Sequence, residues 1–105
     1  MRDASPWEIG QAVVASEAAA LQVLAAQVDG EAFADAAWRL VRATGRMVVA
    51  GVGKSGILAA NVAATFAALQ IPSLVLHPTD ALHGDLGQVS PEDIALLLSY
   101  SGETE

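Results

Sequence analysis

The sequence predicts an α/β fold in which a parallel β-sheet lies between two layers of helices, a three-layer αβα sandwich. Three short apolar runs, at 46–50, 73–77 and 94–98, have the length and composition of strands buried in a parallel sheet. An alanine-rich segment with helical spacing, 54–69, lies between the first two runs. Alternation of strand, helix and strand is typical of parallel sheets with right-handed crossovers, so the order of the elements predicts the fold class.

Two helices are expected before the first strand. Ser5 and Pro6 suit the N-cap and the first helical position, and large apolar residues then recur at helical spacing. Gly30 is expected to end this helix. A second helix is expected over 31–43, and Gly45 is expected to end it.

The order of the elements indicates an incomplete domain. Residues 78–88 are expected to form a loop with about one helical turn, and 91–93 to form a turn before the third strand. No helix is expected after that strand, which would leave much apolar sheet surface exposed. We therefore expect the N-terminal portion of a single domain, with a helical lead-in over 5–44 and an α/β portion over 46–105.

Composition and charge argue against several kinds of partner. The 105 residues are 53% hydrophobic, and 5 basic residues oppose 12 acidic ones, which gives a formal net charge of −7. Nucleic acids and anionic membrane surfaces require basic patches, so neither is expected to bind. We expect no transmembrane span, because no uninterrupted apolar stretch reaches about eighteen residues. We also expect no secretory signal, because the N-terminus lacks a basic region followed by an apolar stretch. The absence of cysteine fits a cytoplasmic protein.

The loop after the first strand, Gly51-Val52-Gly53-Lys54-Ser55-Gly56, has the composition of an anion site. Its glycines permit a tight turn and a close approach of the backbone to a ligand. The start of the following helix presents free N–H groups and the positive end of the helix dipole. Lys54, the only lysine in the chain, adds a charge, and Ser55 adds a hydroxyl. The alternative is that the glycines serve only to let strand and helix pack closely.

Two nucleotide-binding motifs are similar to this loop but fit it less well. It matches the G-x-G-x-x-G dinucleotide fingerprint, which also needs an acidic residue at the end of the next strand for the ribose. His77 and Pro78 stand there, and Asp80 lies further on. A P-loop would need a glycine at the position of Val48. A dinucleotide-binding fragment remains an alternative, which binding of a nicotinamide cofactor would reveal.

The segment after the third strand, Ser99-Tyr100-Ser101-Gly102-Glu103-Thr104, can form a neutral cup of hydroxyl donors for a phosphate. The alternative is an ordinary helix cap, because Ser or Thr followed by an acidic residue is common there. Parallel α/β folds place their ligands beyond the carboxyl ends of the strands. The presence of two such loops after two strands therefore strengthens the prediction of a ligand site at this edge.

Both histidines of the chain, His77 and His83, fall between the second and third strands, near Asp80 and Asp85. Histidine can act as an acid or base near neutral pH, or as a metal ligand. A lone loop histidine is more often structural or solvated, and the spacing here matches no recognisable metal-binding pattern. The crowding of these residues near the expected ligand edge favours a functional role for at least one of them.

Together these motifs resemble the sugar isomerase (SIS) family, and most of all its arabinose-5-phosphate isomerases. The segments that carry the resemblance occur in the family's order and spacing, at 51–56, 77–87 and 99–104. Tyr100 departs from the asparagine or glutamine expected between the two serines. The resemblance implies a Rossmann-like or flavodoxin-like sheet, an oligomer, and interconversion of arabinose 5-phosphate and ribulose 5-phosphate, a step toward a lipopolysaccharide sugar.

The resemblance also implies roles for single residues. Lys54 and His83 would be catalytic, with Lys54 beside a developing oxyanion and His83 moving protons. His77 would match a histidine that binds an inhibitory divalent metal such as zinc, and no cofactor is required. Glu103 and Glu105 are the nearest carboxylates for the base, which stays unassigned. The phosphate and the neighbouring hydroxyls would be held by Gly53, Ser55, Ser99, Ser101, Gly102 and Thr104.

A phosphosugar-sensing module without turnover and an inactive fragment are the other hypotheses. Proton exchange with solvent separates an isomerase from a sensor, because binding alone cannot cause it.

Overall fold

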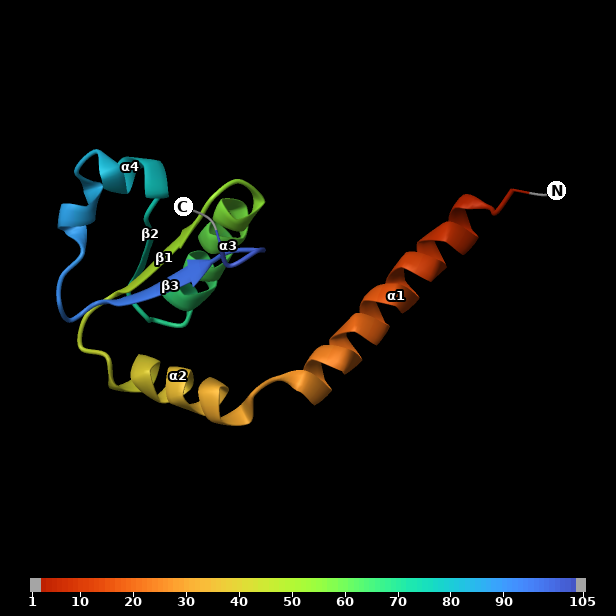
Figure 1. Ribbon diagram of the computed structural model, residues 1–105, viewed down its shortest axis with the longest axis horizontal. Coiled ribbons are helices and arrows are strands. Elements are labelled where there is room, and N and C mark those ends of the chain that lie inside the picture. The colour runs from red at the N-terminus through yellow and green to blue at the C-terminus, as the bar shows by residue number, and fades with distance from the viewer. Residues whose placement is uncertain (1–2, 104–105) are drawn as a thin grey trace. The chain divides into compact units, whose positions relative to one another are not determined.

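The computed structural model describes residues 3–103 and shows an α/β arrangement (Figure 1). Residues up to Asp35 belong to one compact unit and those from Ala36 to another. In chain order the elements are α1 (Pro6–Gln27), α2 (Gly30–Arg42), β1 (Met47–Gly51), α3 (Lys54–Ala68), β2 (Ser73–Val75), α4 (Pro78–Leu82), the 3₁₀ helix η1 (Asp85–Gln88) and β3 (Ile94–Leu98).

The sheet is parallel, with its strands in the order β2-β1-β3. β1 lies in the centre, and all 5 of its residues are buried. This arrangement confirms the predicted α/β class and parallel sheet. β1 and β2 each differ slightly from the expected runs, because β1 continues to Gly51 and β2 ends at Val75.

One face of the sheet packs against α3. Met47 and Val49 of β1 form a core with Ala59 and Ala63 of α3. The alanines allow the helix to lie close to the sheet, and Val49 has no exposed surface. Phe66 adds partly buried apolar surface at the margin of this core.

The α4–η1 segment packs over the opposite face of the sheet (Figure 1). Val48 and Ala50 of β1 are buried there with Leu76, which directly follows β2. Ala81 of α4 and Val89 after η1 are packed against this second core. The second face therefore carries the segment that holds both histidines.

α1 begins as expected. Ser5 is its N-cap and Pro6 its first residue, and Glu8 completes a capping box. The N–H of Glu8 donates to the Ser5 hydroxyl at 3.2 Å, and the N–H of Ser5 donates to the Glu8 carboxylate at 2.7 Å. These bonds satisfy two donors that a helix start otherwise leaves open.

No residue of α1 is buried within the described part of the chain. Its 22 residues are long and apolar enough to cross a membrane, by length and composition alone. A core helix of a soluble protein passes the same test. This finding qualifies the expectation that the chain has no membrane-spanning segment.

The prediction that Gly30 ends the first helix was wrong by two residues, because α2 begins with Gly30. The break falls at Val28 and Asp29. The Asp29 carboxylate accepts the N–H groups of Glu31 at 3.0 Å and of Ala32 at 3.1 Å, which caps α2.

The expected loop over 78–88 contains more helix than predicted, namely α4 and η1. The reason lies at its start, where Pro78 occupies the first turn and the His77 side chain accepts the N–H of Thr79. A histidine therefore takes the N-cap position, where Ser, Thr, Asp or Asn is usual.

Candidate functional site

The three loops singled out in the sequence leave the sheet at the same edge. Gly51, the last residue of β1, is paired with Leu98, the last residue of β3. Val49 is paired with Val75 of β2, so His77 follows β2 at about the level of Gly51. The carboxyl ends of the strands thus bring these loops together, as the sequence predicted.

The glycines of the β1–α3 loop divide into two roles. A methyl group on Gly51 would lie 2.6 Å from the Ser55 carbonyl, and one on Gly56 would lie 2.8 Å from the Gly51 oxygen. These two glycines therefore allow strand and helix to pack closely, which was the alternative reading of the motif. Gly53 has a φ of +62° and open space around it, so its backbone can be approached by a ligand.

The start of α3 carries positive electrostatic potential. No side chain caps its N-terminus, and no acidic residue lies in its first turn. Lys54 is exposed, and within residues 3–103 it has no ion-pair partner. Ser55 is partly buried beside it. The helix dipole and the Lys54 charge both favour an anion at this point.

The loop after β3 is folded by its own serines. The Ser99 hydroxyl accepts the N–H of Gly102 at 2.9 Å, and the Ser101 hydroxyl accepts the N–H of Glu103 at 3.1 Å. Gly102 has a φ of +75°, which glycine adopts without strain. A serine hydroxyl that accepts one hydrogen bond keeps its own proton for donation, so Ser101 can still donate to a phosphate oxygen. Thr104 and Glu105, two further predicted residues, lie outside the described part of the chain.

The two histidines differ in their surroundings. His77 Nδ1 accepts the N–H of Thr79 at 3.2 Å, which gives this residue a structural role at the start of α4. His83 follows α4, is exposed, and precedes Gly84 with a φ of +116°. His83 is therefore open to a ligand, whereas one nitrogen of His77 is already engaged.

A hollow of about 300 Å³ lies between the three strand ends. Gly51 and Ser99 contribute to it from the first and third loops, and Pro78 contributes from the second. Its wall is otherwise apolar, with Leu86 and Leu97 among its lining residues. Of the predicted phosphate contacts, Ser99 alone lines this hollow within the described residues. Lys54, Ser55, Ser101 and His83 do not line it.

Comparison with known proteins identifies the family to which the chain belongs. The family model described as the SIS domain matches residues 40–105. The chain belongs to the SIS domain family. The matched region begins near the end of α2 and includes the whole sheet and all three loops.

Several relatives of this SIS domain are arabinose 5-phosphate isomerases. It is 38% identical over 92 residues to the arabinose 5-phosphate isomerase KpsF of Escherichia coli O6:H1, covering 88% of this chain and 28% of that protein. It is 45% identical over 82 residues to the arabinose 5-phosphate isomerase KdsD of Yersinia pestis, covering 75% of this chain and 25% of the relative. The chain therefore spans less than a third of these relatives.

A solved structure supports the fold. A protein of E. coli CFT073, solved in complex with arabinose 5-phosphate, matches with a TM-score of 0.83 and 36% identity. The match covers 96% of this chain and 55% of the solved one. This SIS domain thus shares its fold with a protein that binds this sugar phosphate, and it spans about half of that protein.

The described residues of the SIS domain do not assemble a metal site. Among residues 3–103, no three His, Cys, Asp or Glu side chains come together as ligands. His77 could offer Nε2, because its Nδ1 accepts a hydrogen bond. His77 is thus a single candidate ligand within residues 3–103, and no chemical step is assigned to a metal.

The sequence predicted exposed apolar surface on the sheet, but it did not predict that this surface lines a hollow. Leu97 is 74% exposed although it lies within a strand, and Leu86 is also exposed. The alternating exposure of β3 shows that one of its faces is open. A continuous Leu run gave no sign of that difference, because fully buried strands have the same composition.

Proposed function

We propose that this SIS domain holds a sugar phosphate at the carboxyl edge of its sheet and serves the interconversion of arabinose 5-phosphate and ribulose 5-phosphate. The pairing of Gly51 with Leu98 carries the proposal, because it sets an anion-binding helix start beside a hydroxyl-bearing loop. The identity to arabinose 5-phosphate isomerases supplies the substrate.

The phosphate group is assigned to the two neighbouring loops. The positive end of the α3 dipole and the Lys54 charge attract the dianion. Hydroxyl donors complete a binding shell that needs no excess of basic residues, which suits a chain of net charge −7. The remaining contacts assigned to the phosphate are Gly53, Ser55, Ser99, Ser101, Gly102 and Thr104.

The reaction moves one proton between adjacent carbons of the sugar. A base removes the proton from C2 of the aldose, an enediolate forms, and a proton returns at C1 to give the ketose. Lys54 stabilises the developing oxyanion by its charge. His83, exposed on the loop that follows α4, relays protons to and from the sugar oxygens. The base itself is not assigned to a residue.

Deuterium exchange tests the proposal directly. The protein is incubated with arabinose 5-phosphate in D₂O, and NMR follows deuterium at C2 of the aldose and C1 of the ketose. Incorporation with formation of ribulose 5-phosphate supports an isomerase that needs no cofactor. Binding without incorporation would identify a phosphosugar sensor instead. Preference for a nicotinamide cofactor over the sugar phosphate would overturn both.

The proposal includes a cytoplasmic homo-oligomer, whose product serves synthesis of a lipopolysaccharide sugar. α1 supplies a surface for a second copy of the chain. Large apolar residues recur every seventh position along one side of α1, at Trp7, Val14 and Leu21. The small residues Ala18 and Ala25 follow Val14 and Leu21 by four positions, on the same side of the helix. Large and small residues that alternate along one seam complement each other when two copies of the helix run antiparallel.

Analytical ultracentrifugation of Leu21→Glu tests this surface. The added charge should lower the oligomeric state, whereas Gln22→Glu, which adds the same charge off the seam, should leave it unchanged. Equal behaviour of the two variants would contradict the assignment. Sedimentation of the wild-type protein with neutral lipid vesicles would instead indicate that α1 binds a membrane.

A further inference from the structure

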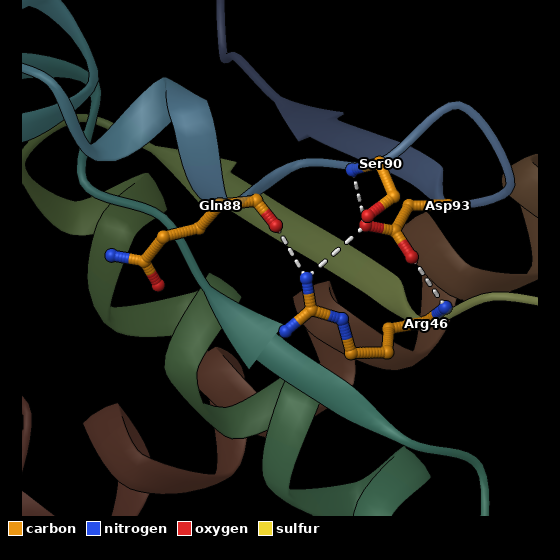
Figure 2. Close-up of polar contacts among 4 residues, drawn as sticks. All are labelled: Arg46, Gln88, Ser90 and Asp93. Atoms are coloured by element: carbon orange, nitrogen blue, oxygen red, sulfur yellow. Dashed lines mark hydrogen bonds and ion pairs between the residues drawn. The ribbon is translucent and has the colours of Figure 1, made fainter.

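The segment that carries His83 is tied to the sheet at both of its ends. At its start, the N–H of Leu76 donates to the Val49 carbonyl at 2.9 Å. At its end, the Asp93 carboxylate accepts the N–H of Ser90 at 2.8 Å and the N–H of Arg46 at 2.7 Å. Figure 2 shows the contacts from Ser90 and Arg46 converging on the Asp93 carboxylate.

The Arg46 side chain adds a contact that the backbone cannot make. Its Nη2 atom donates to the carbonyl of Gln88, the last residue of η1, and to the Asp93 carboxylate at 3.3 Å (Figure 2). The Asp93 side chain is 2% exposed, whereas the Arg46 side chain is 41% exposed. The guanidinium therefore links the end of η1 to a buried carboxylate.

Alignment of β1 with β3 does not depend on that guanidinium. The N–H of Ile94 donates to the Arg46 carbonyl at 2.9 Å, and the N–H of Gly45 donates to the Glu92 carbonyl at 3.2 Å. The N–H of Arg46 holds Asp93 whatever side chain residue 46 carries. The side chain supplies a second contact to Asp93 and the contact to Gln88. Only the contact to Gln88 reaches η1, so the distinct effect of the side chain falls on η1.

The η1 helix in turn shapes the candidate site. Leu86 of η1 lines the hollow with Pro78 and Ala81 of α4, and these residues flank His83 in the sequence. A shift of η1 therefore changes both the wall of the hollow and the path of the chain at His83. Misplacement of about 1 Å can cost an enzyme about a hundredfold in rate.

We propose that Arg46 is a positioning residue that fixes η1 through Gln88 and so sets the position of His83 at the site. The effect on turnover rests on the proposed isomerase function, whereas the effect on the loop does not. Loss of a hydrogen bond from a charged donor weakens local structure by about 1.5–3 kcal/mol, which corresponds to at least about tenfold faster local opening.

Hydrogen–deuterium exchange of Arg46→Met tests the effect on the loop. The N–H groups of Gly87 and Val89, which bond to Gly84 and Leu86 within the segment, should exchange at least about tenfold faster. The N–H of Ile94 in the sheet should keep its rate. The matched control is Arg42→Met, which removes an arginine of α2 that stacks on Trp38 at 5.3 Å.

A second variant guards against a general loss of stability. Arg46→Lys keeps a cation near Asp93, but its shorter side chain should not reach both Asp93 and the Gln88 carbonyl. It should loosen the same loop amides with an unchanged melting temperature. The proposal would be overturned if the loop amides kept their wild-type exchange rates in both variants. It would also be overturned if the exchange rates of loop and sheet amides rose together.

The kinetic readout separates positioning from substrate binding. In the active wild-type protein, Arg46→Lys should lower kcat about tenfold and leave KM for arabinose 5-phosphate nearly unchanged. A change in KM alone would contradict a role through His83. If the wild-type protein shows no turnover, the isomerase assignment fails, and the exchange rates still decide whether Arg46 fixes η1.

Discussion

Gly51 and Leu98 are paired in register as the last residues of two adjacent parallel strands. Their pairing places the start of α3 next to the serine-containing loop that follows β3. The first loop brings the Lys54 charge and the positive end of a helix dipole, and the second brings hydroxyls. The predictions about ligand binding follow from this adjacency.

Replacement of Lys54 by alanine should lower kcat for arabinose 5-phosphate by at least about a hundredfold, as removal of a single oxyanion-stabilising group does in other enzymes. Lys54 is exposed and has no ion-pair partner among the described residues, so the melting temperature should not change. Initial rates and thermal denaturation measured on the same preparation check both parts. Full activity of Lys54→Ala would remove this residue from the mechanism.

The substitution Ser101→Ala should weaken binding of arabinose 5-phosphate about tenfold, because the hydroxyl's hydrogen bond to the charged phosphate is lost. Calorimetric titration measures the change. Ser90→Ala is the matched control, because Ser90 contributes its backbone N–H to Asp93 and alanine keeps that group. A crystal soaked in phosphate should show the anion beside Ser101, and an anion bound only elsewhere would count against the hydroxyl cup.

The fold could be predicted from the sequence because its signals are local. Apolar runs, an alanine-rich helix and the Ser5 cap each depend on a few neighbouring residues. The boundary at Gly30 was misplaced because the Asp29 side chain, one residue earlier, caps the second helix, and a side-chain acceptor decides where a helix begins.

The site was predictable only in part, because its details depend on contacts between distant segments. Gly51 and Gly53 belong to one motif, yet only the position of the Ser55 backbone separates close packing from an open turn. Arg46 and Asp93 are 47 residues apart, and no spacing rule connects them. The assignment of His77 as a helix cap likewise required the path of the chain at Thr79.

Alanine at Gly56 and alanine at Gly53 should have separable effects. A methyl group at Gly56 would meet the Gly51 backbone at 2.8 Å, so Gly56→Ala should destabilise the protein by about 1–3 kcal/mol through overpacking. Gly53→Ala meets no atom within 4 Å but occupies a φ of +62°, so the loop that faces the ligand should be strained. Urea denaturation and phosphate titration of both variants measure the two effects. A larger loss of binding in Gly56→Ala than in Gly53→Ala would contradict the division of roles.

Stability should fall in acid through Asp93. Hydrogen bonds from the Ser90 and Arg46 backbones, and the Arg46 charge, lower the pKa of Asp93 below its ordinary value of 3.8. Because the pKa of Asp93 is lower in the folded state, the ionised carboxylate stabilises the fold fully at any pH above its pKa in the unfolded state. This stabilisation is lost as the pH falls through the pKa of the folded state. Asp93→Asn should therefore lower the melting temperature at pH 7 and narrow the difference from wild type as the pH falls below about 3.8. A difference that stays constant down to pH 2 would assign the effect to geometry and not to charge.

Zinc sensitivity should depend on His77, if the inhibitory site implied by the family resemblance exists in the protein. His77→Asn keeps an oxygen acceptor for the N–H of Thr79 at the start of α4, and it removes the Nε2 atom that could bind a metal. We expect an unchanged melting temperature and at least about tenfold weaker zinc binding by calorimetry, in line with the loss of a ligand. His83→Asn is the comparison, because His83 is exposed but is not assigned to the metal. Equal zinc affinity in wild type and His77→Asn would show that zinc binds elsewhere, and the role of His77 would then be the cap alone.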